Sequence, residues 1–445
     1  MKEGVVFLKN DKLRQKITQL LRHQGYLRYA KNISWLALEK LIRLIVGLFV
    51  SIWLARYLGP LEYGLLNYVQ SYVFIFAVIT SLGMDTIIVR ELVEKKYSKE
   101  KILGTAFYSK IIATFIIFPL LYLATYFLVS DKYSSTLIYI VAIGVIFQSF
   151  NVIDSYYQSV VKSKYVVIAN IIAMCLSSLI KIALIINNAS LIYFAIAYSI
   201  DGAIVALMLL IFFTKNSKTK IVKWSIDIRT VKYLVNESAP MWLSGLMIAI
   251  YAKTDQLMIK DMLGSEELGY YSAAVKLNDL FGFVPLIICS SLLPAIVNAR
   301  NTSKKKYFKR ISYLYSLMIW LSIFILILGN LLAKQIVDLS FGLLYLKATE
   351  VFKLLLWSNV FIFFLTAWAK FIIVEKNQKL FFYFDSLAVI INIILNIFLI
   401  PRYGIRGAAF ATVLAVPIAQ VIIYIFWKKQ RYILKSFFKS LFLRF

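Results

Sequence analysis

Fifteen charged side chains lie inside long apolar stretches of this sequence, where a charge is costly and usually serves a function. Cations in such places are suited to holding an anionic group such as a phosphate, and carboxylates to carrying a proton or a metal cation. The cations are Lys40, Arg43, Lys110, Lys181, Lys253, Lys276, Lys353 and Lys370, and the acids are Glu39, Asp85, Asp154, Asp201, Asp255, Asp279 and Asp385. Because the two signs nearly balance, a cationic cavity requires the acids to lie elsewhere.

Four of these cations, Arg43, Lys181, Lys253 and Lys276, are the candidates for binding an anionic substrate. Arg43 follows Glu39 by four residues, so the two share one face of a helix. The alternative for this pair is a neutralised cluster whose long side chains reach toward the membrane interface. Lys181 has no acid near it in the sequence.

Two further pairs differ in their spacing. Lys253 and Asp255 are two residues apart and project to roughly opposite sides of a helix, so at most one of them faces a groove. Lys276 and Asp279 are three apart and share a stripe, which we expect to line a groove, with Pro285 kinking the helix just beyond. The alternative is that these two charges neutralise each other.

The acids Glu39, Asp201, Asp255 and Asp279 are the candidates for gating or ion coupling. Asp201 is the most central acid of its apolar stretch. It either carries a proton or pairs with a lysine on another helix, and the second interpretation is favoured.

Other charged residues lie nearer the ends of the stretches. Lys110 is expected to extend its side chain to the interface, as Lys353 and Lys370 are. Asp85, Asp154 and Asp385 are expected to close gates with loop cations.

A polar stripe adds uncharged candidates. Gln148, Asn151, Ser155, Gln158 and Lys162 advance by three or four residues and therefore share one face of a helix. The amides of Gln148, Asn151 and Gln158 suit sugar hydroxyls, whereas the alternative is polar packing between helices. Asn392 and Asn396 repeat the pattern more weakly.

The composition explains where these residues must lie. The chain has 445 residues, is 61% hydrophobic and has a mean hydropathy of +0.77, more apolar than a soluble domain. Stretches long enough to cross a bilayer as helices are predicted at 35–57, 65–89, 103–129, 136–160, 165–186, 190–213, 239–260, 270–297, 311–329, 351–374, 380–400 and 404–427. The expected fold is therefore an all-α polytopic membrane protein with twelve transmembrane helices.

The loop charges predict the orientation. Alternate loops carry 35 Lys and Arg against 7 in the others, so both termini are expected in the cytoplasm. The formal charge of +28 then follows from topology and gives no reason to expect a nucleic-acid partner. The predicted parts are a basic tail (1–32), a six-helix bundle (33–213, here the N-half), a cytoplasmic connector (214–238), a second bundle (239–427, the C-half) and a basic tail (428–445).

A short motif occurs at matching places in both halves. LGPLEYG (58–64) and LGSEELG (263–269) each carry two glycines five residues apart, and each joins the first and second helix of its half on the outer side. Six helices separate the motifs, so both halves insert in the same direction. Two such halves are related by an axis along the membrane normal, and a substrate site is expected between them.

The sequence gives little reason to expect disulfides, a metal site or catalysis. Cys175 and Cys289 lie inside apolar stretches, and His23 has no Cys or His neighbours, so neither a disulfide framework nor a metal site is expected, and no cofactor is implied. No Ser/His/Asp set or phosphate-cradling glycine loop is present. The longest outer segment, about 330–350, is short and mostly apolar. We therefore expect a protein that is not an enzyme.

The run KNISWLALEKLIRLIVGLFVSIWLARYLGPLEYGLLNYVQS (31–71) resembles the opening of the Wzx-type polysaccharide flippases. These belong with the lipid II flippases and the MATE exporters to the multidrug/oligosaccharidyl-lipid/polysaccharide (MOP) superfamily. Further matches follow in order: LGMDTIIVREL (82–92), DSYYQSVVKSKY (154–165), DQLMIKDMLGSEELGYYSAAVKL (255–277), FGLLYLKATEVFKLLLW (341–357) and IPRYGIRGAAFATVL (400–414). The resemblance covers nearly all of the chain from about Lys31.

The resemblance implies a two-bundle transporter in the bacterial cytoplasmic membrane. Its expected substrate is undecaprenyl-diphosphate-linked oligosaccharide, moved by alternating access to the outer leaflet for O-antigen or capsule synthesis. Membrane lipid, a polysaccharide polymerase and a chain-length regulator are the implied partners. A MATE-type cation-coupled drug exporter and a lipid II flippase are the alternatives, although the lipid II branch usually has fourteen helices.

Overall fold

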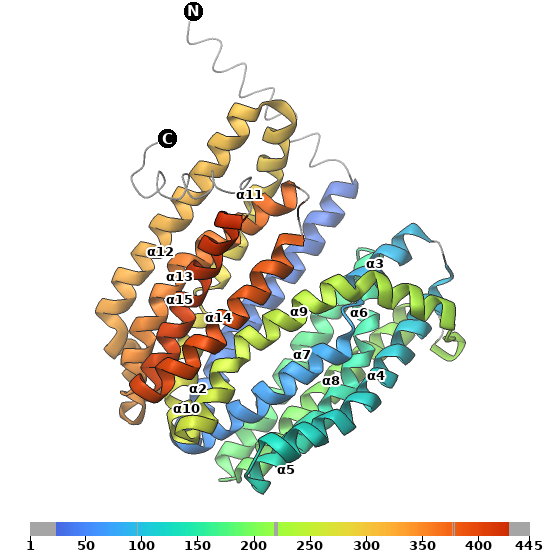
Figure 1. The fold of residues 1–445 in the computed structure, drawn as a ribbon. Helices are drawn as coiled ribbons and strands as arrows, with labels where there is room; N and C mark the ends of the chain where they lie inside the picture. Colours follow the sequence, from blue (N-terminus) through green and yellow to red (C-terminus); the bar gives the residue numbers. More distant parts are fainter. Residues whose placement is uncertain (1–23, 96, 218–220, 376, 378, 427–445) are drawn as a thin grey trace, which may run out of the picture.

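The computed structural model describes residues 24–95, 97–217, 221–375, 377 and 379–426, and Figure 1 shows their course. These residues form α-helices and three short 3-10 helices, with no strand among them. The predicted C-terminal tail (428–445) and most of the N-terminal tail lie outside the described residues. The first helix of the described residues, α2, covers the predicted span from position 35 and also the eleven residues before it, from Gln24 on.

The helices follow one another with short connections. In chain order they are α2 (Gln24–Ser81), α3 (Asp85–Glu94), α4 (Lys99–Leu128), α5 (Lys132–Ile143), η1 (Gly144–Asn151), α6 (Val152–Ser159), α7 (Lys164–Ile186), α8 (Leu191–Asn216), η2 (Ile221–Lys223), α9 (Ile228–Leu263), α10 (Ser265–Asp279), α11 (Phe283–Thr302), α12 (Lys304–Phe341), η3 (Leu343–Tyr345), α13 (Ala348–Val374), α14 (Lys379–Tyr403) and α15 (Ile405–Phe426).

Ten helical stretches among the described residues are long and apolar enough to cross a membrane. One of them, Ser34–Glu94, contains the turn at Gly59 and so holds two helical legs. The 36-residue α9, which carries charges along its length, is not among the ten. The structure is thus a multi-pass helical membrane protein, and the count of twelve spans stays a prediction.

Both repeated motifs form turns around a glycine. Gly59 has φ 69° and Gly264 has φ 97°, a backbone conformation that other residues rarely adopt. At Gly59 the first leg of α2 ends and its second leg, 60–81, turns back (Figure 1). The end of the molecule with these turns is called the connector face here, and the end where α2 begins and α15 ends is called the terminal face.

The second helix of each half is interrupted. The second leg of α2 stops at Ser81 and α3 starts at Asp85, with Leu82 and Gly83 at positive φ between them. In the C-half, α10 ends at Asp279 and α11 starts at Phe283. Pro285 was expected to allow a kink below Lys276 and Asp279, and the helix does break there. Pro285 lies in the first turn of α11, where its missing N–H costs nothing.

Buried apolar side chains form three clusters that distinguish the two faces. One cluster draws on both halves, with Leu66 and Phe194 of the N-half beside Leu268 and Phe352 of the C-half. A second cluster contains residues 289–424 alone, and a third contains residues 84–234 alone. The halves thus share a core near the connector face and have separate cores elsewhere.

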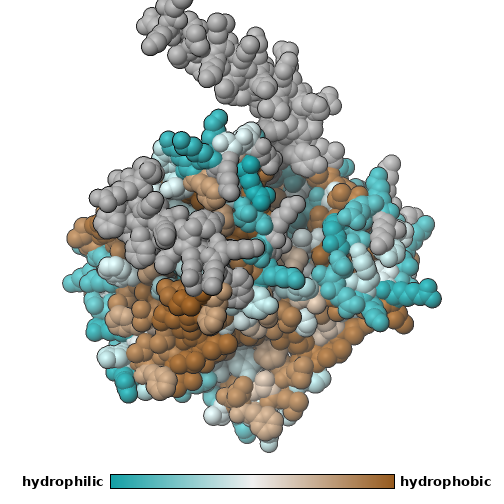
Figure 2. All heavy atoms as spheres, turned by 45° about the horizontal axis from the view of Figure 1, so that its top comes forward, coloured by the Kyte–Doolittle hydropathy of each residue, from teal (hydrophilic) through white to brown (hydrophobic). Residues whose placement is uncertain are grey.

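The helix α9 crosses between the two groups of helices (Figure 1). Near its start, Glu237 forms an ion pair with Arg90 of α3 at 2.8 Å, and Trp242 donates to the carbonyl of Val78. Farther along, α9 packs against α14. Hydrophilic side chains gather on the terminal face, and hydrophobic ones dominate the surface below it (Figure 2).

Candidate functional site

A cavity of about 380 Å³ lies between the two halves. One wall is the first leg of α2 and the other is the break between α10 and α11. The lining residues are Lys40, Arg43, Leu44, Gly47, Leu48, Lys276, Asp279, Leu280, Phe283 and Leu286. Three of the predicted site residues, Arg43, Lys276 and Asp279, therefore meet in one place, here called the interhalf cavity.

The side chain of Arg43 forms an ion pair with Glu39 and is still largely exposed. Its guanidinium lies 2.6 Å from the Glu39 carboxylate, and its side chain is 58% exposed against 12% for Glu39. Glu39 also accepts a hydrogen bond of 3.0 Å from the Asn170 amide of α7. Glu39 thus anchors the first leg of α2 to α7 and holds Arg43 at the cavity wall.

Lys276 and Asp279 share the cavity without forming an ion pair in the described structure. The carboxylate of Asp279 interacts electrostatically with Lys276 and with Lys253 of α9. The Lys253 ammonium lies 5.7 Å from the centre of the Phe74 ring and 3.4 Å from the Gln256 side-chain oxygen. Lys40, Arg43 and Lys276 line the cavity and Lys253 approaches it. These four cations exceed the two carboxylates beside them, Asp279 in the lining and Glu39, which pairs with Arg43.

Lys181 lies elsewhere, inside the N-half. Its ammonium is 2.6 Å from the Asp201 carboxylate, 3.0 Å from the Ser177 hydroxyl and 4.0 Å from the centre of the Tyr198 ring. The lysine side chain is 8% exposed. The predicted binding cation and the predicted central acid are thus each other's partners, and neither lines the interhalf cavity.

Asp255 is buried in the C-half and receives three hydrogen bonds from neutral donors. Tyr271 donates at 2.7 Å, Asn396 at 2.6 Å, and Thr412 also donates. No cation of the described chain pairs with this carboxylate. The side-chain oxygen of Asn396 is buried without a partner, and Asn396 donates to the Asn392 oxygen at 3.1 Å.

The polar stripe meets an ion pair between the buried Lys110 and the exposed Asp85. Gln148 and Asn151, carried by the 3-10 helix η1, line a small cavity together with Asp85 and Lys110. The Lys110 ammonium is 2.5 Å from the Asp85 carboxylate, and its side chain is 3% exposed. The expectation that Lys110 reaches the interface was wrong, because a carboxylate at the start of α3 neutralises it in place.

The far end of the stripe has a different environment. Gln158 is exposed and donates to the Asp154 carboxylate at 3.0 Å, whereas Ser155 is buried. The 3-10 geometry of η1 interrupts the α-helix that the stripe was predicted to follow. The stripe is therefore not one uniform wall.

At the connector face the two repeated motifs pack against each other. A methyl group added at Gly64 would lie 1.8 Å from the backbone oxygen of Ser265, and one added at Gly269 would lie 1.9 Å from that of Pro60. The contact is reciprocal and depends on small residues, as in close helix crossings in membranes. Sequence spacing indicated a duplicated turn but contained no signal that the two copies touch.

Polar contacts join the halves at the same face. Arg56 donates to the carbonyl oxygens of Leu339 and Ser340 at 2.5 Å and 2.7 Å. The Tyr345 hydroxyl donates to the carbonyl of Ala55 at 2.8 Å. The connector face is closed by these contacts, and the interhalf cavity lies away from it.

The two halves are joined at the connector face, and a charged cavity lies between them away from that face. This arrangement of helices is a fold seen in known transporters. The chain superposes on a structure described as "Lipid II flippase MurJ, inward closed conformation" with a TM-score of 0.73 and 16% identity, over 93% of this chain and 91% of the other. It superposes on an inward-facing MATE family transporter of the MOP superfamily with a TM-score of 0.69 and 14% identity, over 91% and 99%. An outward-facing MATE transporter gives a TM-score of 0.63 and 13% identity, over 94% and 98%.

The family is given by the sequence itself. Residues 29–300 match the model of the family described as polysaccharide biosynthesis protein, and the chain belongs to this family. No curated protein sequence is significantly similar to the chain.

Proposed function

We propose that the protein is a flippase that moves undecaprenyl-diphosphate-linked oligosaccharide repeat units from the cytoplasmic to the outer leaflet for surface polysaccharide synthesis. The interhalf cavity is the observation that carries the proposal. It takes Arg43 from the N-half and Lys276 from the C-half, so a substrate bound there contacts both moving parts. Membership in the polysaccharide biosynthesis family supports the substrate class.

The chemistry of the cavity suits a lipid-linked diphosphate. Arg43 offers a guanidinium that binds a phosphate through two parallel hydrogen bonds, and Lys276 offers a compact charge. The apolar lining, including Phe283 and Leu286, matches a ligand with a hydrocarbon chain. The exposed amides of Gln148 and Gln158 are assigned to sugar hydroxyls outside the cavity.

Alternating access is the proposed mechanism. The shared core and the reciprocal glycine contact hold the connector face closed, while the separate cores allow the halves to part at the terminal face. The greater similarity to inward-facing than to outward-facing transporters agrees with this state. With the terminal face in the cytoplasm, as the loop charges predict, the cavity would load from inside.

Asp255 is proposed as the ion-coupling residue. Its carboxylate is buried with neutral donors, and the unpartnered Asn396 oxygen lies on the residue that donates to it. A carboxylate, an amide oxygen and a hydroxyl together suit a hard monovalent cation such as sodium, and a proton would neutralise the carboxylate as well. Asp201 is not assigned this role, because Lys181 already neutralises it.

The same cluster favours the second candidate function, a cation-coupled multidrug exporter of the MATE type. This chain has the same fold as a MATE family transporter, and Asp255 would exchange ions in a flippase and in an exporter alike. A lipid II flippase is a third candidate function, supported by the fold alone. The substrate distinguishes these candidates, since a drug cation has no need of Arg43 and Lys276.

The test uses cells that lack this protein and lipid extraction followed by mass spectrometry. An undecaprenyl-diphosphate-linked repeat unit is expected to accumulate and to disappear when the wild-type chain is restored. Arg43→Ala and Lys276→Ala should each fail to relieve the accumulation.

Lys353→Ala is the matched control, since Lys353 forms an exposed pair with Glu350 and does not line the cavity. Normal lipid extracts together with increased drug sensitivity would overturn the flippase proposal in favour of the exporter. Accumulation relieved by all three variants would leave the flippase and remove the residue assignment.

A further inference from the structure

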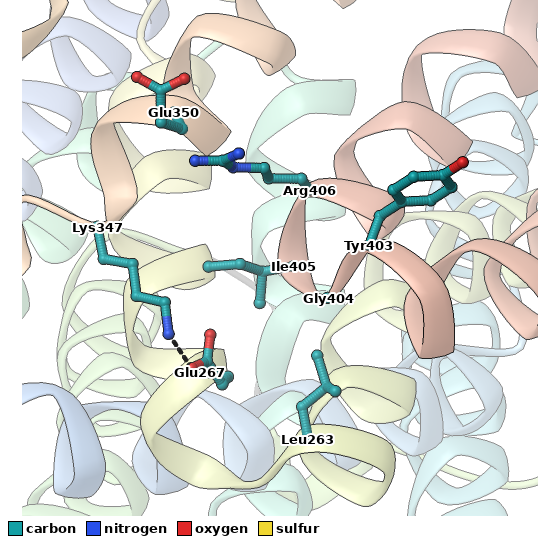
Figure 3. Close-up of a pocket in the computed structure, with 8 residues that line it drawn as sticks. All are labelled: Leu263, Glu267, Lys347, Glu350, Tyr403, Gly404, Ile405 and Arg406. Atoms are coloured by element: carbon teal, nitrogen blue, oxygen red, sulfur yellow. Dashed lines mark hydrogen bonds and ion pairs between the residues drawn. The ribbon is translucent and has the colours of Figure 1, made fainter.

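The largest of the cavities described here, about 480 Å³, opens at the connector face of the C-half and takes no part in the proposed transport path. It is lined by Leu263, Glu267, Lys347, Glu350, Tyr403, Gly404, Ile405 and Arg406 (Figure 3). Three sequence motifs, at 255–277, 341–357 and 400–414, each contribute to it. It is called the connector-face pocket here.

The charges in the pocket are compensated except at Arg406. Lys347 forms an ion pair with Glu267, which Figure 3 shows, and Glu350 pairs with Lys353 at 3.1 Å. Arg406 is exposed, and none of the ion pairs or hydrogen bonds among the described residues involves its side chain. In Figure 3 its guanidinium extends from α15 toward the side of the pocket that carries Lys347 and Glu350. An anion entering the pocket would therefore meet the Arg406 guanidinium without a counter-charge, and beside it Lys347, whose charge Glu267 shares; the charge of Glu350 is offset by Lys353.

The backbone around the pocket adds to this positive field. The helices α10, α13 and α15 all begin at its edge, with Glu267, Glu350 and Arg406 in or next to their first turns. An acidic residue in the first turn offsets the positive end of a helix. The first two helices have such a residue and α15 has none, so the charge that remains is at Arg406.

The surroundings indicate where the anion comes from. Leu343 and Leu344, 73% and 68% exposed, lie four and three residues before Lys347 in the chain, and Tyr403, which lines the pocket, is 59% exposed. Exposed leucines next to a tyrosine and two cations are typical of the level at which lipid headgroups meet the hydrocarbon. The pocket thus lies where phosphate groups of lipids are concentrated.

We propose that the connector-face pocket binds a phosphate group, held by Arg406 and Lys347, from the headgroup of an anionic lipid. Free phosphate offers the same chemistry but lacks the apolar contacts beside the pocket. The proposal concerns a site separate from the interhalf cavity, so it does not depend on the transported substrate.

The experiment measures the unfolding temperature and lipid retention of the full-length protein, purified in detergent, by thermal scanning and native mass spectrometry. The probes are dioctanoyl phosphatidylglycerol, dioctanoyl phosphatidylcholine as the lipid without net charge, and inorganic phosphate. Phosphatidylglycerol should bind and raise the unfolding temperature, and phosphatidylcholine should have a much weaker effect.

Arg406→Gln should weaken binding of phosphatidylglycerol by roughly tenfold or more, and Lys347→Gln by less, because Glu267 already shares that charge. Arg402→Gln is the matched control: Arg402 lies in the same motif on α14 but does not line the pocket. Arg43→Ala should also leave this binding intact.

Equal weakening by Arg402→Gln and Arg406→Gln would overturn the proposal, since it would indicate unspecific surface charge. Equal binding of the two lipids would overturn it as well. If inorganic phosphate alone gives the full, Arg406-dependent effect, the pocket is a phosphate site and its lipid source is wrong. Monodisperse gel filtration of each variant excludes misfolding as the cause.

Discussion

Each half holds a carboxylate among its helices, partly exposed at Asp201 and buried at Asp255, and the two carboxylates have different partners. In the N-half, Asp201 lies 2.6 Å from the Lys181 ammonium and so has a full counter-charge. In the C-half, Asp255 is held by a phenol, an amide and a hydroxyl and has no counter-charge. A buried charge without an ion partner is costly. This difference in counter-charge is why Asp255, and not Asp201, is the residue proposed for ion coupling.

The difference follows from what surrounds each acid. In the N-half, the aromatic ring of Tyr198 and the hydroxyl of Ser177 surround the Lys181 ammonium beside Asp201. Each cluster leaves one buried oxygen without a hydrogen-bond partner, Oδ1 of Asp201 in the N-half and the side-chain oxygen of Asn396 in the C-half. The two clusters therefore differ in counter-charge, which Asp201 has in Lys181 and Asp255 lacks among the described residues.

The largest effect is expected from breaking the N-half pair. Asp201→Asn leaves the Lys181 ammonium buried without a counter-charge and should cost about 3 kcal/mol of stability. Thermal unfolding of the purified protein in detergent measures the loss. The double variant Lys181→Met/Asp201→Leu should recover most of it, because apolar side chains of similar size replace both charges. Equal losses in the single and double variants would show that the pair is not what stabilises this site.

A second effect tests whether the two repeated motifs are equivalent. Gly64→Ala and Gly269→Ala each place a methyl group within 2 Å of a backbone oxygen of the other motif, so the helices must separate. Each should cost about 1–3 kcal/mol, a typical cost of overpacking. The unfolding temperature provides the measurement, and Gly245→Ala, whose nearest new contact is an ordinary 3.9 Å, is the control. A loss at one glycine alone would contradict a reciprocal contact.

At Asp255 the free energy of unfolding should depend on the sodium concentration more than on the loss of the negative charge. Asp255→Asn keeps the shape of the cluster and should change stability by about 1 kcal/mol. The wild-type chain should gain about 1.4 kcal/mol from sodium at ten times its dissociation constant, and the variant should gain none. Thermal scans over a sodium series, with Asp261→Asn as an exposed control on the same helix, decide the matter. Persistence of the sodium effect in Asp255→Asn would remove Asp255 from ion coupling.

The smallest effect is at the start of α9, outside the membrane helices. The Thr230 hydroxyl, followed by Lys101, lowers the pKa of Asp227 from its ordinary 3.8 to about 2. A lowered pKa stabilises the folded state above the unfolded pKa, so the contribution should be present above about pH 4 and lost toward pH 2. The Thr230 amide donates to Asp227 at 3.0 Å. Its protection against hydrogen exchange, relative to the intrinsic exchange rate at each pH, measures this contribution. In Asp227→Asn, the protection of the Thr230 amide should not change between pH 4 and pH 2.

Much of the fold could be predicted from the sequence, because long apolar stretches in lipid have to be helical and the loop cations alternate along the chain. The turns at Gly59 and Gly264 were predicted from glycine spacing and are confirmed. Helix breaks were harder to predict. Pro285 marks the neighbourhood of the break between α10 and α11, but its bounds at 280–282 could not be predicted, since packing against other helices decides where a chain departs from helical geometry.

By itself, the sequence determined which charges lie in the membrane helices, since a span and its ionisable residues are both local properties. Only the tertiary structure decided their partners. Arg43 and Lys276, far apart in the chain, line one cavity, whereas Lys181 and Lys110 are neutralised by acids on neighbouring helices. The physical reason is that a charge pair forms across three or four ångströms of space, and helical periodicity gives the face of a helix but not the helix that packs against it.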